Sequence, residues 1–350
     1  MLKMTGKERL TAMIKGERID RIGISGWLHM PLVDHNLEAF VKETIDFTDN
    51  NQWDFVKLMP SGHYFAEAYG AEIEFLNNPK EWSGKIHKYP IQSYQDLIKL
   101  SVIEPKQNPT FKREIEFARQ IVNHYQGDKP VLATIFTPLT WIQEMLSSTN
   151  PEPVIQLMQQ HKSELHHALE VILATNLKLL DEFIDVGIDG IFLSTQWATS
   201  DLISRELLAE FCHPYDQALL NHIKGKTWFN LLHLHYSENL LFDEFVNYEG
   251  IHALNWENCA KTDDSSKLSS IESVRALFPD KVLIAGIDQH HDFTTVSENR
   301  ETVKSILKNR LTTALKESES QKFIFAPGCA LPLDVDPSVF SLLHEVVNEL

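Results

Sequence analysis

Cysteine is scarce in this sequence. The 350 residues contain three, Cys212, Cys259 and Cys329, too few for a disulfide framework, and this indicates a protein of the reducing cytoplasm. No apolar run approaches the roughly 18 to 20 residues of a transmembrane helix. Residues 1–21 carry dispersed charge and no apolar centre, so they are not a signal peptide. We therefore expect a cytoplasmic protein that does not enter the membrane.

Positive charge is also in short supply. Lys and Arg number 32 against 49 Asp and Glu, which gives a formal net charge of −17. Like charges repel at long range, so nucleic acid and anionic membranes are excluded as partners, and a highly anionic substrate is disfavoured. We expect the partner to be a small-molecule substrate.

The chain has no solenoid repeat, and no G-x-G-x-x-G follows its first predicted strand, so a dinucleotide-binding fold has no support. Instead, short β-branched or apolar runs alternate with longer stretches of helical periodicity. Eight runs are predicted strands: Arg21–Gly26, Trp53–Met59, Pro130–Phe136, Gly187–Thr195, Trp228–His235, Ile251–Glu257, Lys281–Asp288 and Lys322–Cys329.

The intervening segments have the apolar spacing of amphipathic helices, clearest in Ser163–Val186 and Glu298–Ser318. Near the end of the chain, Asp336 is predicted to cap a last helix and Pro337 to lie in its first turn. Eight strands alternating with helices predict a (β/α)8 TIM barrel, an α/β fold, as a single domain over residues 1–350. Extra N-terminal helices and insertions around residues 60–130 complete the prediction, and an open doubly wound sheet is the alternative.

The residues at the carboxyl ends of the predicted strands are the candidates for a site, because such barrels hold their chemistry there, and polar side chains and soft ligands are frequent among them. They are Trp27, His29, Pro60, His63, Thr137, Pro138, Gln196, Trp197, His233, His235, Asn255, Glu257, Asp288, His290, His291 and Cys329. We therefore expect the functional site at this end of the barrel.

His233 and His235 are the most suggestive pair, because residues i and i+2 of a strand point the same way. Imidazole and thiolate are preferred zinc ligands, and a catalytic zinc keeps three protein ligands and one open position. His233, His235 and Cys329 would supply that number, with water, substrate or Glu257 in the fourth position. The pairs at 166–167 and 290–291 are the chance neighbours that 16 histidines allow, and Cys212 and Cys259 are interpreted as structural. Amidohydrolases place a His-x-His pair on the first strand and an aspartate after the eighth, so this pattern differs from theirs.

Several motifs together resemble one known family. They are KERLTAMIKGERIDRIGIS, WDFVKLMPSGHYFAEAYG, IFTPLTWIQEM, GIDGIFLSTQWATSDLISRELLAEFCHPY, LNWENC and FAPGCALPLDVDP, and they cover nearly the whole chain. The chain is identified by them as a member of the uroporphyrinogen decarboxylase superfamily. The resemblance implies a (β/α)8 barrel and one of two activities: cofactor-free decarboxylation in haem synthesis, or zinc-dependent methyl transfer linked to corrinoids.

This sequence differs from the decarboxylase branch at four functional positions. Its arginines after the first strand pair with substrate carboxylates, but residues 22–41 contain no Arg or Lys. Its aspartate after the second strand falls in LMPSGH, which has no acid. Its serine after the fourth strand aligns with Gln196, and its C-terminal histidine aligns with Cys329.

The sequence resembles the methyltransferase branch more closely at the residues that hold the metal. Its zinc is held by a His-x-Cys pair after the fifth strand and by the cysteine of a Gly-Cys motif after the eighth. HLH matches the first motif with His235 in place of cysteine, and PGCALP matches the second. The loss of a thiolate leaves the metal more Lewis-acidic, which makes a bound thiol more acidic but less nucleophilic and also favours a hydrolytic or carbonyl-polarising role.

The sequence therefore predicts a zinc-dependent methyltransferase that moves a methyl group from a separate corrinoid protein to a thiol. The alternatives are a decarboxylase for a less anionic substrate and a non-catalytic barrel that binds a tetrapyrrole or corrinoid, and a homodimer is left open. The predicted metal ligands are His233, His235 and Cys329. The predicted catalytic residues are Glu257, His63 and Gln196, and the predicted substrate contacts are Trp27, His29, Trp197, Asn255 and His290.

Overall fold

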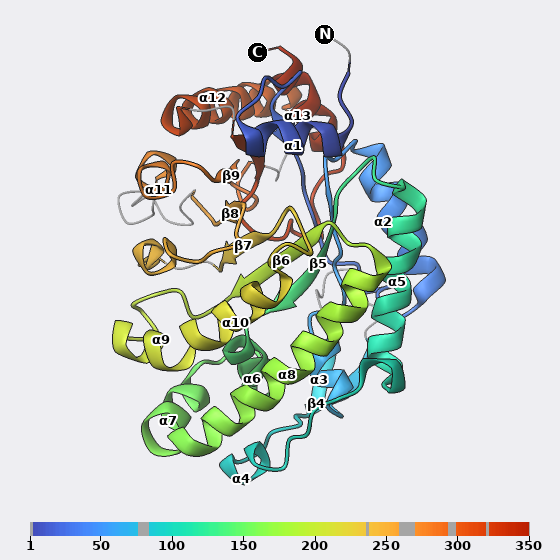
Figure 1. Ribbon diagram of the computed structural model, residues 1–350. Helices are drawn as coiled ribbons and strands as arrows, with labels where there is room; N and C mark the ends of the chain where they lie inside the picture. Colours follow the sequence, from blue (N-terminus) through green and yellow to red (C-terminus); the bar gives the residue numbers. More distant parts are fainter. Residues whose placement is uncertain are drawn as a thin grey trace.

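Eight strands form one sheet at the centre of the molecule (Figure 1). The structure, a computed structural model, describes residues 3–75, 84–235, 238–258, 270–292, 299–319 and 322–349. The strands of the sheet are β1 (Gly23–Ile24), β2 (Val56–Lys57), β5 (Val131–Phe136), β6 (Gly190–Thr195), β7 (Leu231–Leu234), β8 (Ala253–Asn255), β9 (Val282–Ile287) and β10 (Phe323–Pro327). Each lies inside one of the eight predicted runs.

The sheet is parallel throughout and follows the order β1-β10-β9-β8-β7-β6-β5-β2. Its two end strands also meet, because the backbone N–H of Asp54 donates to the carbonyl of Ile24 at 3.0 Å. The Ser25 hydroxyl adds a bond to the carbonyl of Phe55 at 3.3 Å. These contacts close the sheet, so the predicted (β/α)8 barrel is confirmed and the open sheet is not the fold.

Helices surround this sheet (Figure 1). They are α1 (Gly6–Lys15), α2 (Leu37–Asn50), α3 (Tyr64–Ala68), α4 (Tyr94–Leu97), α5 (Pro109–Tyr125), α6 (Pro138–Ser147), α7 (Glu152–Gln160), α8 (Lys162–Val186), α9 (Arg205–Phe211), α10 (His213–Ile223), α11 (Ile271–Leu277), α12 (Arg300–Ser318) and α13 (Ser338–Asn348), with short 3₁₀ turns at Pro105–Gln107 and Phe242–Phe245. Among the described residues one helix, α1, precedes β1, where several were predicted.

The predicted insertion lies between β2 and β5. It contains α3, an antiparallel hairpin of β3 (Glu72–Glu74) and β4 (Lys85–Lys88), and α4. The last helix, α13, begins at Ser338, so Pro337 immediately precedes it instead of lying in its first turn. The Asp336 carboxylate accepts a hydrogen bond from the Ser338 N–H at 2.9 Å, as expected of a capping residue.

Alternation along the strands divides the core into two layers. Side chains on the inner face, such as Leu132, Phe192, Leu231 and Ile284, pack with Leu10 of α1 in one cluster. Their sequence neighbours point outward and pack against the surrounding helices. Because successive strand residues face opposite sides, the inner face of each strand leads directly to the lumen at its carboxyl end.

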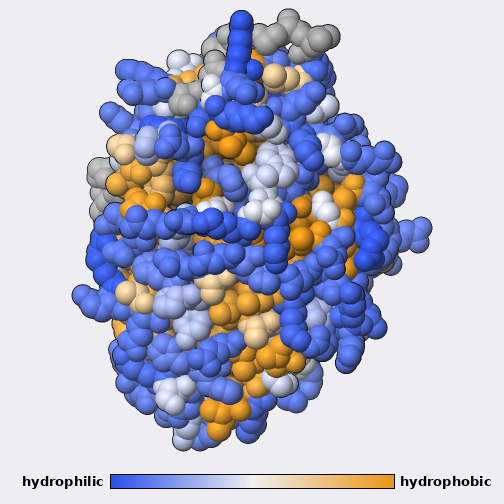
Figure 2. Space-filling model, in the orientation of Figure 1, coloured by the Kyte–Doolittle hydropathy of each residue, from blue (hydrophilic) through white to orange (hydrophobic). Residues whose placement is uncertain are grey.

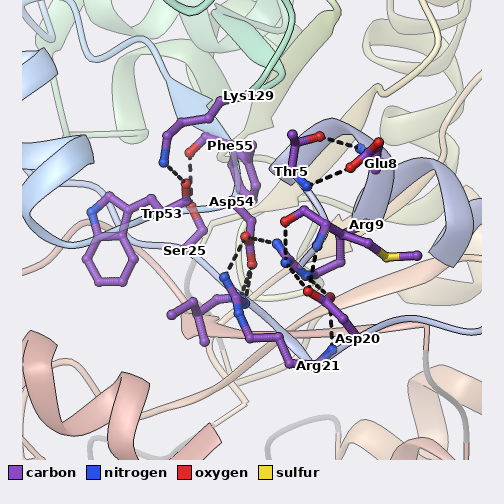
Figure 3. Close-up of polar contacts among 12 residues, drawn as sticks. Thr5, Glu8, Arg9, Asp20, Arg21, Ser25, Trp53, Asp54, Phe55 and Lys129 are labelled. Carbon is purple, nitrogen blue, oxygen red and sulfur yellow. Dashed lines mark hydrogen bonds and ion pairs between the residues drawn. The ribbon is translucent and has the colours of Figure 1, made fainter. Parts of the chain in front are cut away.

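Helix α1 is held to the barrel by a buried ion network that Figure 3 shows. Arg9, 1% exposed, donates to the carboxylates of both Asp20 and Asp54. Arg21 donates to both oxygens of Asp54, at 2.8 and 2.9 Å. The same Asp54 carboxylate accepts the backbone N–H of Ile24 at 2.8 Å. One buried carboxylate therefore joins α1, β1 and the start of β2.

Hydrophilic side chains cover most of the face drawn in Figure 2, with hydrophobic residues in separate groups between them. Among the helices of the described residues, none combines the length and the apolar character needed to cross a bilayer.

We predict that Asp54→Asn lowers the free energy of unfolding by about 3 to 5 kcal/mol, because it leaves two arginines facing a neutral side chain in a buried site. Chemical denaturation measures this change. The control is Asp46→Asn, which removes an exposed ion pair with Lys42 on α2 and should change stability far less than Asp54→Asn. Equal effects of the two substitutions would contradict the role assigned to Asp54.

Candidate active site

A cavity of about 660 Å³ opens at the carboxyl ends of the barrel strands. Its size is typical of a small-molecule site. Eight of the predicted site residues line it: Trp27, His29, Gln196, His233, His235, Glu257, His290 and Cys329. Other lining residues, among them Lys57, Met59, Tyr64, Phe136, Trp141, Glu144 and Phe192, were not predicted.

His233 and Cys329, 96 positions apart in sequence, meet in this cavity, with His233 Nε2 3.9 Å from Cys329 Sγ. The other ring nitrogen of His233, Nδ1, lies 2.6 Å from Asn255 Oδ1. The Asn255 amide nitrogen donates to the carbonyls of Ile284 and Pro327, which fixes the amide so that its oxygen faces His233. Because that oxygen can only accept, the Nδ1 of His233 carries a proton. Nε2 therefore faces Cys329, where it can take the proton of the thiol and form an imidazolium beside the thiolate.

The position of Cys329 depends on the glycine before it. A Cβ at Gly328 would lie 2.4 Å from the Cα of Glu257, so only glycine allows the end of β10 to press against the end of β8. Burial raises the pKa of the Cys329 thiol, but the hydrogen bond and charge of His233 more than offset this, and the pKa lies below its ordinary value. The cysteine is therefore prepared to act as a thiolate.

His235 faces the same cavity but lies apart from this pair. Its ring centroid is 6.0 Å from that of His233, with the ring planes at 88°, and its side chain is exposed. Within the described part of the chain, no three His, Cys, Asp or Glu side chains are grouped as a metal site. His233 and Cys329 thus fit as two zinc ligands, and His235 can join them only after its side chain rotates.

Glu257 supplies a carboxylate beside the same pair. It is 5% exposed, and its Oε2 lies 4.0 Å from His290 Nε2. Its charge also counteracts the lowering of the Cys329 pKa. This geometry can accept or deliver a proton at the Cys329 side of the cavity.

Lys57 is a cavity residue that the sequence analysis missed. It lies on β2 between the inward Phe55 and Met59, and its Nζ is 4.4 Å from the centroid of the Phe192 ring. Burial lowers the pKa of Lys57 to about 7. Burial, followed by the charge of Lys57, also lowers the pKa of His29 to about 3. The alternation of residues 55, 57 and 59 is the signal that could have identified this lysine.

A second polar group lies on α6, after β5. The Gln143 amide donates to Gln196 Oε1 at 2.7 Å, and Gln196 Nε2 donates to Glu144 Oε1 at 3.2 Å. His63 Nδ1 is 3.6 Å from Glu144 Oε2. No sequence signal pointed to Gln143 or Glu144, because they sit within a helix, several residues beyond the strand end.

Three predicted site residues do not line the cavity. Trp197 follows Gln196 by one position, so its side chain points to the opposite side of the sheet from those of Phe192 and Gln196. It is fully buried in the layer under the helices. Asn255 lies beneath His233 and orients it. His63 is buried behind Glu144. Cys212 is buried in the outer core, consistent with a structural role, and Cys259 lies outside the described residues.

We predict opposite effects of two substitutions on the Cys329 thiol in chelator-treated protein. His233→Gln should raise the thiol pKa, and Glu257→Gln should lower it, because the imidazole stabilises the thiolate and the carboxylate opposes it. The pH dependence of iodoacetamide alkylation, followed by mass spectrometry, gives both values. A shift in the same direction for both variants would refute this account of the site.

Lys57 should react with acetic anhydride with a midpoint near pH 7, because burial favours its neutral amine. Peptide mass spectrometry of protein labelled from pH 6 to 11 measures the profile. The internal control is Lys42, whose pKa is raised by its hydrogen bond to Asp46. Its midpoint should lie above the ordinary value for lysine, and coincident profiles would argue against a perturbed Lys57.

Comparisons with known proteins agree with this architecture. A search of curated proteins finds no match. Among solved structures, a methyltransferase from Methanosarcina mazei superposes with a TM-score of 0.79 at 18% identity, covering 99% of each chain. A B12-independent methionine synthase from Shewanella sp. W3-18-1, in complex with selenomethionine, gives a TM-score of 0.57 at 13% identity, over 94% of this chain and 97% of that one. Residues 5–350 match the family described as uroporphyrinogen decarboxylase (URO-D), and the chain belongs to that family.

Proposed function

We propose that this protein is a zinc-dependent enzyme that transfers a methyl group to a thiol. The observation that carries the proposal is the meeting of His233 Nε2 and Cys329 Sγ at 3.9 Å in the cavity. Imidazole nitrogen and cysteine sulfur are both preferred zinc ligands, and the position of these two atoms in one cavity supports the proposal. Asn255 supplies the outer hydrogen bond that zinc-binding histidines usually make.

His233, Cys329 and, after rotation of its side chain, His235 would hold the metal. Zinc bound there would lower the pKa of a thiol substrate and so make it nucleophilic near neutral pH. Glu257, buried beside Cys329, would accept the proton that the thiol releases. Trp27, Met59 and Phe192 line the same cavity and limit the access of water to the reacting atoms.

The methyl donor is proposed to be a separate corrinoid protein, and this part of the proposal rests on the family resemblance alone. The opening of the cavity at the carboxyl ends of the strands gives a donor access to His233 and Cys329. The enzyme character of the protein is supported by its family and by the two solved enzymes whose fold it shares.

The lining of the cavity disfavours decarboxylation of a polycarboxylate. The described lining residues include no arginine, and burial lowers the pKa of their one lysine, Lys57, to about 7. Recognition of many carboxylates depends on fixed cations such as paired guanidinium groups. Glu144, Glu257 and Asp334 would repel such a substrate instead.

Purified protein loaded with zinc should contain about one equivalent, measured by inductively coupled plasma mass spectrometry after gel filtration. His233→Ala and Cys329→Ala should remove it, and His235→Ala should weaken its retention by one to two orders of magnitude, since each substitution deletes a ligand. The matched control is His222→Ala, because His222 is bonded to Asp181 on the outer surface, away from the cavity. Its zinc content should be unchanged.

The same samples test the reaction. Loss of methylcobalamin absorbance in the presence of dithiothreitol should require zinc, and it should fall at least about a hundredfold in Cys329→Ala. Wild-type protein without stoichiometric zinc would contradict the proposal. Turnover of uroporphyrinogen by zinc-free protein would establish the decarboxylase alternative instead.

A further inference from the structure

A row of hydrogen-bonded side chains, here called the proton chain, joins α10 to the segment that follows β7. At its buried end lies Asp216 of α10, 1% exposed, with Oδ2 at 3.2 Å from the Tyr248 hydroxyl. His213 Nδ1 lies 2.7 Å from the same hydroxyl. His213 Nε2 is 3.3 Å from the carboxylate of Glu244, which also pairs with the exposed Arg205. The proton chain therefore runs from the outer core to the surface.

Two loops are joined beside the proton chain. One leads from β6 to α9 and α10, and the other leads from β7 to the 3₁₀ turn Phe242–Phe245. The backbone N–H of Leu241 donates to the Ala198 carbonyl at 2.9 Å, and that of Ser200 donates to the Asn239 carbonyl at 3.1 Å. These bonds hold the described parts of the two loops side by side.

Both loops begin at the cavity and end at the proton chain. Gln196 directly follows β6, His235 directly follows β7, and both side chains line the cavity. At the far ends, Asp216 belongs to α10, whereas Tyr248 comes after the 3₁₀ turn. The contact between Asp216 and Tyr248 thus fastens two segments whose other ends form part of the cavity wall.

The buried end of the proton chain has few partners. Asp216 Oδ1 has no hydrogen-bond partner among the described residues, and no Lys or Arg of that part of the chain forms an ion pair with this carboxylate. The titratable side chains that interact with this part of α10 are His166 and Glu170 of α8, Glu210 of α9, Cys212 between α9 and α10, and Glu244 and Tyr248 after β7. A buried, ionised carboxylate with a single hydrogen bond is costly, so this environment favours a protonated Asp216.

The geometry allows two complete arrangements of hydrogen bonds. In the first, a protonated Asp216 donates to Tyr248, and the Tyr248 hydroxyl donates to His213 Nδ1. His213 Nε2–H then donates to Glu244. In the second, Tyr248 donates to an ionised Asp216, and His213 carries a proton on both nitrogens to reach Tyr248 and Glu244. Both arrangements hold the same number of protons, so one proton is exchanged between Asp216 and His213.

Loss of this one proton breaks the proton chain. The ionised Asp216 then takes the hydrogen of Tyr248, and a neutral His213 has one N–H for two acceptors. Either the Tyr248 oxygen or the Glu244 carboxylate is left facing a lone pair of the ring. Burial raises the pKa of Asp216 to about 8, despite the opposing hydrogen bond from Tyr248. The proton is therefore held at neutral pH and lost in mildly alkaline solution.

We propose that Asp216 and His213 share one proton that clamps the two cavity loops together, and that its loss at alkaline pH releases them. This clamp goes beyond the proposed function, because it requires neither zinc nor any particular reaction in the cavity. The folded protein keeps a proton on Asp216 that the unfolded chain loses near the ordinary pKa of 3.8. The clamp's contribution to stability therefore falls as the pH rises from about 4 to about 8.

Hydrogen–deuterium exchange followed by mass spectrometry tests the clamp on the full chain near pH 7 and near pH 9.5. After correction for the exchange rate of an unfolded chain, peptides from residues 198–203 and 238–245 should lose at least about fivefold in protection at the higher pH. Asp216→Asn should abolish this loss, because its amide donates to Tyr248 at any pH, as the protonated carboxyl does. The matched control is Asp181→Asn, which removes an exposed partner of His222 on α10 and should behave as the wild type.

Tyr248→Phe and a stability measurement complete the test. Tyr248→Phe removes the central hydroxyl, so the same peptides should already be poorly protected at pH 7. Asp216→Asn should be at least as stable as the wild type at pH 7 and more stable at pH 9.5 in chemical denaturation. Full protection in Tyr248→Phe, an unfolded Asp216→Asn, no loss of protection in the wild type, or equal losses in wild type and Asp216→Asn would each overturn the proposal.

Discussion

The barrel depends on one buried carboxylate at the seam between its first two strands. Every other neighbouring pair of strands is joined by a backbone ladder. At the seam between β1 and β2, the described residues form one backbone hydrogen bond, from Asp54 N–H to the Ile24 carbonyl, and the Ser25 hydroxyl donates to the Phe55 carbonyl. The Asp54 side chain reinforces this point by binding Arg9, Arg21 and the Ile24 N–H. Because Arg9 belongs to α1, the same network closes the sheet and fixes the helix that packs into its interior. The geometry of the opposite end, where the cavity lies, follows from a closed barrel.

Closure brings distant residues together by a simple rule. His233 on β7 and Asn255 on β8 are paired in register and both lie on the inner face of the sheet. Gly328 allows the end of β10 to approach β8 closely, and this brings Cys329 next to His233. The hydrogen bonds of Asn255 to two carbonyls of the barrel wall then set the tautomer of His233. The residues that pack directly beneath His233 thus decide which of its ring nitrogens faces Cys329.

The cavity has two polar sides with different characters. On one side, His233, Cys329 and Glu257 offer metal ligands and a proton acceptor. On the other, Glu144 is held by Gln196 next to aromatic rings. Lys57 contributes an amine with a pKa of about 7 between apolar neighbours.

The sequence by itself determined the eight strands, their order along the chain and the end of the barrel that carries the site, because these follow from periodicity and from the fixed direction of parallel strands. It also identified His233, Cys329 and Glu257, since each follows or ends a strand. Tertiary structure alone decided that Trp197 points away from the cavity and that Glu144 and Gln143 enter it from a helix. It also left His235 outside any grouped metal site with His233 and Cys329 in the described residues, with 6.0 Å between the centroids of the two histidine rings. Local pattern specifies which face of a strand a residue occupies, whereas the distance between two side chains from different elements depends on how the closed barrel packs.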